Sequence, residues 1–226
     1  MLELGGFTPL TTTDWPGKLA AVAFVQGCPW HCRYCHNPEL QPRGVHHGPL
    51  WPEVLAMLAR RVGLLDGLVF SGGEPTLEPD LAQAVDEVRA LGLKVGLHTA
   101  GIYPERLAAL LPALDWVGFD LKTDAAGYDA LTTRRDSAAP VRRALDHLLA
   151  SGVDHEIRTT YHPSIVGDEA LVAMARQLKA IGATTWVLQR WQPFDEASAD
   201  LVASWHWPLP ALLEQLRSDI PALTLR

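Results

Sequence analysis

Short apolar runs alternate with longer amphipathic stretches along most of the chain. Six runs are rich in apolar or β-branched residues, as expected for buried parallel strands: 19–26, 68–71, 95–98, 116–120, 156–161 and 185–189. Five stretches between them have a helical pattern, and several begin near a proline or end before a glycine, as helices often do: 51–62, 80–91, 104–111, 140–150 and 168–181.

This strand–helix–strand order predicts an α/β fold with a parallel sheet and right-handed crossovers. An open doubly wound sheet and a partial barrel both fit the order. In either case, functional groups are expected at the carboxyl ends of the strands and in the loops that follow them. We expect a single domain over residues 1–226, in which a less regular, Trp-rich segment at about 191–226 caps the open end of the sheet.

The composition narrows the possible partners. The formal net charge is −7, which argues against a general nucleic-acid binder, because neutralising phosphates requires an excess of Lys and Arg. The N-terminal residues lack a basic segment followed by an apolar run, so no signal peptide is expected. No apolar stretch approaches the roughly 20 residues that span a bilayer, so no membrane partner is expected.

The three cysteines lie together in the segment QGCPWHCRYCHNPEL, residues 26–40, with Cys28, Cys32 and Cys35 spaced Cys-x3-Cys-x2-Cys. An odd, clustered set is a poor disulfide framework and indicates reduced thiols, hence a cytoplasmic protein. Three thiolates on one loop, here residues 27–38, can bind three irons of a cubane cluster. The fourth iron would then lack a protein ligand, and an open metal position is where chemistry can occur.

Two alternatives give this cluster a different meaning. The first is a structural zinc site with His31 or His36 as the fourth ligand, although zinc usually takes its ligands from two separated pairs. The second is a set of buried or incidental thiols without a metal.

Further polar residues follow other predicted strands. The turn Ser-Gly-Gly-Glu-Pro at 71–75 would let a ligand approach the backbone at Gly72 and Gly73, and Glu74 adds a negative charge. Asp120 and Lys122 follow the fourth strand; as a surface ion pair they would contribute little. Arg158 lies in the fifth strand, where it could bind a ligand or pair with a core acid such as Glu156.

The cysteine spacing resembles the cluster loop of the radical S-adenosylmethionine (SAM) superfamily, in which the amino and carboxylate groups of SAM occupy the fourth iron. The residue before the third cysteine is often aromatic in that family, and here it is Tyr34. The resemblance implies a partial (β/α)6 barrel, a [4Fe–4S] cluster and SAM. It also implies that the Gly-Gly-Glu-Pro turn holds the methionyl amino group.

The glycyl-radical-enzyme activases of this superfamily are similar at further positions. Their Asp-x-Lys contacts SAM and resembles Asp120 and Lys122, and their arginine facing the SAM carboxylate resembles Arg158. Their Thr-Asn-Gly is here Thr99-Ala100-Gly101, so only Thr99 remains as a contact. Their Cys-His-Asn resembles Cys35-His36-Asn37, which makes Asn37 a further candidate cofactor contact.

Residues 5–40 closely resemble activating proteins of anaerobic ribonucleoside-triphosphate reductase, in particular through Thr13-Asp14-Trp15-Pro16-Gly17-Lys18 and the cysteine loop. The resemblance implies reductive cleavage of SAM and removal of an α-hydrogen from a glycine of that partner enzyme. It also implies flavodoxin or ferredoxin as the electron donor. The alternatives are a radical SAM enzyme acting on a small molecule, similar to 7-carboxy-7-deazaguanine synthase, and a non-enzymatic zinc or iron–sulfur module.

Overall fold

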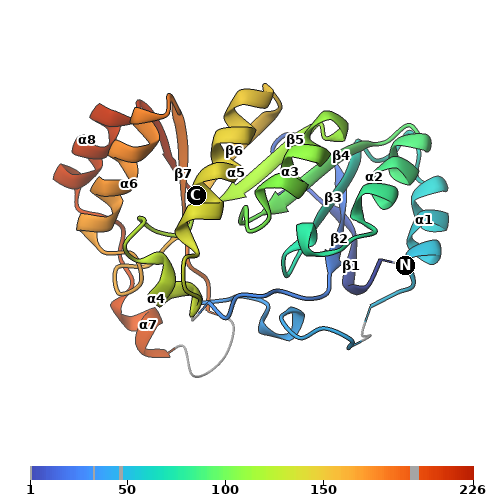
Figure 1. Cartoon of the computed structure of the whole chain (residues 1–226), viewed down its shortest axis with the longest axis horizontal. Helices are drawn as coiled ribbons and strands as arrows, with labels where there is room; N and C mark the ends of the chain where they lie inside the picture. Colours follow the sequence, from blue (N-terminus) through green and yellow to red (C-terminus); the bar gives the residue numbers. More distant parts are fainter. Residues whose placement is uncertain (1, 33, 46–47, 194–198) are drawn as a thin grey trace.

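The computed structural model describes residues 2–32, 34–45, 48–193 and 199–226. Arg33, which belongs to the predicted cluster loop, lies outside the described residues. The strands form one sheet in the order of the sequence, from β1 to β8 (Figure 1). Their bounds are β1 Leu4–Thr11, β2 Ala20–Val25, β3 Gly67–Gly72, β4 Lys94–Thr99, β5 Trp116–Asp120, β6 Asp154–Tyr161, β7 Thr185–Arg190 and β8 Ala222–Leu225.

The strand order confirms the partial barrel. Strand β1 pairs antiparallel with β2, and every later neighbour pair is parallel. A doubly wound sheet would reverse its strand order at a switch point. Here the order never reverses, so right-handed crossovers place all the connecting helices on one side of the sheet.

The helices run around the outside of this curved sheet, from α1 at one end to α8 at the other (Figure 1). The α-helices are α1 Trp51–Ala59, α2 Leu81–Ala90, α3 Pro104–Leu110, α4 Tyr128–Thr132, α5 Ala138–Ser151, α6 Asp168–Ala180, α7 Ala199–Ser204 and α8 Pro210–Asp219. Three 3₁₀ turns complete the set: η1 Pro38–Leu40, η2 Pro75–Leu77 and η3 Leu111–Ala113. The five predicted helices are therefore present, with ends shifted by three residues or fewer.

Alternation along the strands divides the side chains between two faces. In β2, Ala21, Ala23 and Val25 join the large core between sheet and helices, whereas Ala20 and Val22 face the inside of the sheet. On the inner face, the described residues include a small apolar cluster, to which Trp15 and Trp116 contribute. The rest of the inner face is therefore free to carry polar side chains, and the candidate site lies there.

Two edge strands were not predicted. Strand β1 contains Gly5, Gly6 and Pro9, which are poor strand residues, yet it pairs with β2 through two register shifts. A Cβ on Gly5 would overlap the side chains of Leu40 and Gln26, so packing below the cluster loop requires glycine there. Strand β8 has only four residues and pairs with β7 at the other edge.

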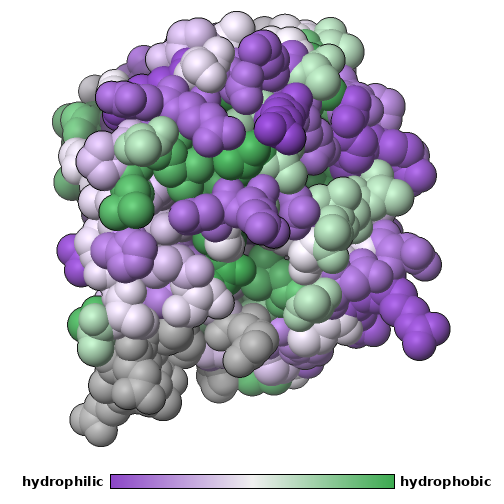
Figure 2. Space-filling view, turned by 90° about the vertical axis from the view of Figure 1, so that its left-hand side faces the viewer, coloured by the Kyte–Doolittle hydropathy of each residue, from purple (hydrophilic) through white to green (hydrophobic). Residues whose placement is uncertain are grey.

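The segment after residue 190 is more regular than its sequence indicates, because its described residues include α7, α8 and β8. Trp207 stacks on Tyr161 of β6 with ring centroids 6.2 Å apart. Figure 2 shows the face of the molecule at the α6 and α8 end of the sheet, where apolar patches are interrupted by polar side chains. Val202 and Leu209 are among the exposed apolar residues of this segment.

Within the described ranges, no helix has the length and apolar character needed to cross a bilayer.

Candidate active site

The loop that carries the cysteines is closed at its base by main-chain bonds. The amide of Gly27 donates to Leu40 O at 2.8 Å, and the amide of Cys28 donates to Gln41 O at 3.0 Å. Below them, the buried side chain of Gln26 donates to the carbonyls of Glu39 and Pro42 at 2.9 and 2.7 Å. Both ends of the loop are thus held together independently of any metal.

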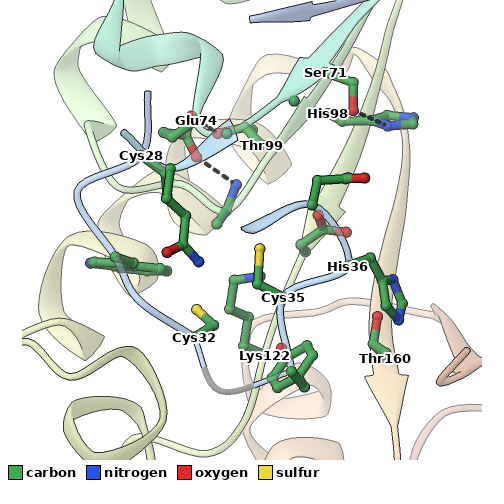
Figure 3. Close-up of a pocket in the computed structure, with 18 of the residues that line it drawn as sticks. Cys28, Cys32, Cys35, His36, Ser71, Glu74, His98, Thr99, Lys122 and Thr160 are labelled. Atoms are coloured by element: carbon green, nitrogen blue, oxygen red, sulfur yellow. Dashed lines mark hydrogen bonds between the residues drawn. The ribbon is translucent and has the colours of Figure 1, made fainter. Parts of the chain in front are cut away.

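The three cysteines line one cavity of about 220 Å³ on the inner side of the sheet. Each is half-buried, and the side chains of Cys32 and Cys35 are close to Lys122 (Figure 3). Burial raises the pKa of the Cys28 thiol to about 12 and also raises that of Cys32, while the charge of Lys122 acts in the opposite direction. Binding a metal as thiolates would therefore release protons from this loop.

The glycines after β3 lie directly against the cysteine loop. Gly72 has a φ of 115°, which favours glycine. A Cβ on Gly73 would overlap the carbonyl of Gly27, and the Gly27 carbonyl also accepts a bond from the amide of Glu74 at 2.9 Å. The two segments predicted to share a site are therefore in main-chain contact.

Gly73→Ala should separate the two segments. Its methyl group would meet main-chain atoms of Gly27 and Leu40, which cannot move without opening the loop. We expect loss of most of the reconstituted iron and a destabilisation of about 2 kcal/mol or more, measured by iron analysis and thermal unfolding. Gly6→Ala is the control for a glycine near the loop, since its added Cβ would make only ordinary contacts, at 3.6 Å or more, with the Phe24 side chain. Normal iron content in Gly73→Ala would contradict the packing argument.

Glu74 lines the cavity but is fully engaged with the protein. Its carboxylate is buried and accepts bonds from the amide and hydroxyl of Thr76, the hydroxyl of Thr99 and the amide of Ala100. Burial raises its pKa, and these four donors oppose that shift. Glu74 thus connects the loop after β3 to the loop after β4. Thr99 reaches the cavity edge as the donor to Glu74.

Asp120 and Arg158 are cross-strand neighbours on β5 and β6. Arg158 Nε donates to Asp120 Oδ1, so the partner of this arginine is Asp120. Glu156, the alternative partner, pairs instead with Arg226 at 2.7 Å. Burial alone would raise the pKa of Asp120, but the charges of Arg158 and Lys122 outweigh it and hold the pKa below its ordinary value. The ion pair that forms is therefore Asp120 with the buried Arg158 on the inner face, and not the surface pair of Asp120 with Lys122 that the sequence left open.

Lys122 and Tyr34 both line the cavity and lie close to each other. Lys122 Nζ lies 5.5 Å from the centre of the Tyr34 ring, and Tyr34 is buried. Burial opposes the charge of Lys122, but Tyr34, Cys32 and Asp120 outweigh it, so its pKa lies well above the ordinary value. Asn37 also lines the cavity and makes no side-chain cap to the turn η1 that follows it. Every predicted site residue therefore lies around one cavity.

His98 was missed by the sequence analysis. It is buried at the end of β4, with Nδ1 3.1 Å from Ser71 Oγ and Nε2 2.8 Å from the carbonyl of Asp14 (Figure 3). A carbonyl only accepts, so Nε2 carries the proton and Nδ1 accepts from the Ser71 hydroxyl. The sequence could have indicated His98 as a site residue, because it lies at the carboxyl end of a predicted strand. It also lies two residues after Gly96, and therefore on the same face of the sheet.

The charge state of His98 leads to a pH prediction. Burial and the Arg158 guanidinium lower its pKa from 6.5 to about 3, although Asp120 and Asp14 act in the opposite direction. The unfolded imidazole takes up a proton near pH 6.5 and the folded one does not, so stability falls as the pH drops below 6.5. The free energy of unfolding should therefore fall by about 2 kcal/mol between pH 7 and pH 5 because of His98. His98→Gln should lose correspondingly less thermal stability over that range; equal losses would contradict a neutral, buried imidazole.

The cavity continues into an outer groove. His36, Thr160 and Gln189 line both, and His36 lies near Thr160 at the edge of the cavity (Figure 3). The groove is bounded by Thr12, Thr13 and Pro16 of the β1–β2 turn, and by Arg190, Gln192 and Arg226 near the ends of β7 and β8. The site is therefore reached from the side on which the two edges of the sheet face each other.

The arrangement also bears on the zinc alternative. Among the described residues, no group of three or more His, Cys, Asp or Glu side chains is placed to hold a single metal ion. A tetrahedral zinc site needs its ligands to converge on one point. Thiolates of a cubane bind separate irons at the corners of one cube, so their sulfurs lie farther apart than the ligands of a single zinc ion.

Comparison with known proteins identifies the family. Residues 22–177 match the family model of the radical SAM superfamily. The chain belongs to the radical SAM superfamily. Membership implies a [4Fe–4S] cluster and SAM as cofactors. The spacing of Cys28, Cys32 and Cys35 and the close glycine turn beside them fit that pair of cofactors.

Relatives of known sequence include a Methanocaldococcus jannaschii protein provisionally named a glycyl-radical enzyme activating enzyme. It is 27% identical over 202 residues, which cover 85% of this chain and 81% of the relative. The pyruvate formate-lyase-activating enzyme of Clostridium pasteurianum is 33% identical over 53% of this chain and 52% of its own. A PqqA peptide cyclase of Gluconobacter oxydans is 31% identical over 68% of this chain and 44% of its own.

Solved structures share the fold at low sequence identity. Streptococcus suis SuiB bound to the precursor peptide SuiA has a TM-score of 0.66 at 14% identity, and the match covers 91% of this chain and 48% of SuiB. QueE from Escherichia coli has a TM-score of 0.59 at 15% identity and matches 100% of this chain and 93% of its own. At these identities the likeness concerns the radical SAM fold alone.

Proposed function

We propose that this protein is a glycyl-radical-enzyme activase, which cleaves SAM reductively and generates a radical on a glycine of a partner enzyme. The observation that carries the proposal is the single cavity lined by the three cysteines, the Gly72–Gly73 turn and the charged groups of β5 and β6. This cavity offers thiolates for a cluster and, beside them, both signs of charge for an amino acid moiety.

The residues of the cavity have separate roles in this proposal. Cys28, Cys32 and Cys35 hold the cluster, and the main chain at Gly72 and Gly73 accepts bonds from the methionyl ammonium group. A cluster bound to these cysteines would supply the electron for reductive cleavage of SAM. Lys122 and Arg158 offer positive charge to the SAM carboxylate, and Asp120 holds Arg158 in place. Tyr34, Asn37 and Thr99 line the same space and complete it.

The outer groove supports a polypeptide substrate. It is open and lined by hydroxyl, amide and guanidinium groups, which can form hydrogen bonds with an extended main chain. A glycine held there would lie beside the cavity, where the 5′-deoxyadenosyl group of SAM would supply the chemistry that removes one of its α-hydrogens. Relatives whose names refer to activation of an enzyme or to a peptide substrate favour the same class of substrate.

We infer anaerobic ribonucleoside-triphosphate reductase as the partner and flavodoxin or ferredoxin as the electron donor. The basis is the resemblance of the Thr13–Lys18 segment and of Cys35-His36-Asn37 to activators of that reductase. The chain spans about half of the Clostridium activase, so its partner is tested by experiment rather than transferred from that relative.

The deciding experiment is anaerobic reconstitution followed by incubation with SAM and dithionite. We expect about four irons and four sulfides per chain, 5′-deoxyadenosine, and a glycyl EPR doublet when the reductase is present. One zinc without sulfide would refute the enzyme. 5′-Deoxyadenosine without a glycyl signal on any glycyl radical enzyme would favour a small-molecule substrate instead.

Single substitutions test the SAM contacts separately from the cluster. Asp120→Ala or Lys122→Ala is expected to weaken SAM binding about ten-fold or more while the iron content stays unchanged, because each removes a charge from the cavity. Lys179→Ala is the matched control, since Lys179 lies on the outside of α6 and pairs with Asp219. Unchanged SAM affinity in both site variants would refute these contacts.

A further inference from the structure

The turn between β1 and β2, residues 12–19, enters the inside of the sheet. Trp15 is buried there and stacks on Trp116 of β5, with ring centroids 5.8 Å apart. A Cβ on Gly67 of β3 or on Gly96 of β4 would meet the Trp15 ring at 3.0 Å. Two strands therefore lack side chains where this ring lies, and the turn forms the floor of the space below the candidate site.

Asp14 gives this floor one polar contact to the sheet. Its carboxylate is engaged by its own turn, because it accepts bonds from the hydroxyls of Thr11 and Thr13 at 2.5 and 3.4 Å. Its main-chain carbonyl instead meets His98 Nε2 of β4 at 2.8 Å. The imidazole therefore ties the turn to the inner face of the sheet.

The same imidazole contacts Arg158. Arg158 Nη1 lies 3.1 Å from His98 Nε2, and the other side of the guanidinium is held through Nε by Asp120. A Cβ on Gly118 of β5 would lie 2.8 Å from Arg158 Nη1 and 2.9 Å from His98 Cδ2. Glycine at that position leaves the space in which the two side chains meet.

We propose that His98 is a positioning residue, which braces Arg158 against the floor of the site and so keeps its guanidinium directed toward the SAM carboxylate. The inference rests on the proposed SAM-binding function and deepens it. With Nε2 protonated toward Asp14, His98 accepts nothing from Arg158, so it acts by occupying the space into which the guanidinium would otherwise turn. It also remains uncharged beside that cation.

Two amide substitutions of different side-chain length, His98→Gln and His98→Asn, test whether His98 positions Arg158. The amide of His98→Gln can extend to the Asp14 carbonyl, as Nε2 does, whereas that of His98→Asn ends near the position of Nδ1. We expect the SAM dissociation constant of the reconstituted protein to stay within about three-fold for the glutamine variant. It should rise about ten-fold for the asparagine variant, as expected for the loss of one buried hydrogen bond and its packing.

Three further measurements separate positioning from simple structural support. Iron content should be unchanged in both variants, and KM for SAM should rise with the dissociation constant. In an Arg158→Leu background, the difference between asparagine and glutamine should vanish, because His98 acts through the arginine. His147→Asn is the control, since His147 is exposed on α5.

A second route loosens the floor without touching the polar groups. Trp15→Phe leaves part of the space beside Gly67 and Gly96 empty, and it is expected to weaken SAM binding about three-fold at unchanged iron content. This variant decides the matter if His98→Asn does not fold.

The proposal is overturned if His98→Asn, or Trp15→Phe in its place, binds SAM as tightly as the wild type. It is also overturned if only the thermal midpoint falls while the SAM affinity of the folded protein stays the same. A wild-type protein that assembles its cluster and binds no SAM would refute the proposed function instead, before any variant is compared.

Discussion

Replacing Cys28, Cys32 or Cys35 by alanine is expected to abolish 5′-deoxyadenosine formation and to remove most of the reconstituted iron and sulfide. Each thiolate would hold a different iron, so replacing one cysteine leaves a second iron of the cube without a thiolate. Iron and sulfide analysis, with a 5′-deoxyadenosine assay on the same samples, measures both effects.

His31→Ala and His36→Ala are the matched controls for these cysteine variants. Both histidines lie in the same loop and were possible fourth ligands of a zinc site; His31 Nδ1 instead lies 3.0 Å from Gln41 Oε1. Both variants should keep their iron. A cysteine variant with full reductive cleavage, or a histidine variant that loses its metal, would show that the ligand assignment is wrong.

Glu74→Ala is expected to destabilise the protein by about 2–4 kcal/mol, because it leaves four donors without their acceptor in a buried site. Two of the donors are main-chain amides, of Thr76 and Ala100, and each would lose its acceptor. For a chain of this length, the thermal midpoint should fall by roughly 5–15 °C. Thermal unfolding of the reconstituted protein measures the shift.

Glu74→Gln refines this prediction. Its amide oxygen can still accept from Thr76 and Thr99, but its NH2 group would face the amide of Ala100, donor against donor. It should fall between wild type and Glu74→Ala. Glu169→Ala, on the exposed first turn of α6, should change stability by less than about 0.5 kcal/mol. A Glu74→Ala variant as stable as this control would show that Glu74 does not stabilise the protein by connecting the loops after β3 and β4.

The central strands and their connecting helices were predictable because their patterns are local. The run Trp116–Asp120 is apolar up to its last residue, and the structure ends β5 at the same place. The cysteine spacing and the Gly-Gly-Glu-Pro turn likewise placed the candidate site at the carboxyl ends of the strands, where the cavity lies.

The remaining features depend on contacts between distant residues. Strand β1 is stabilised by pairing with β2 and not by its own glycines, so its pattern did not indicate a strand. The roles of Glu74 and His98 follow from partners up to 84 positions away, such as Asp14. A single residue type in the sequence does not show whether its polar atoms are already engaged by the protein.

The hydrogen bonds that join the two ends of the cysteine loop also affect how the protein binds its cluster. Gln26 and the main-chain bonds at Gly27 and Cys28 order both ends of this segment as the protein folds. The conformational entropy of arranging the ligands is then lost during folding rather than during metal capture. A loop preorganised in this way should bind an iron–sulfur cluster more tightly than a flexible peptide with the same three thiols.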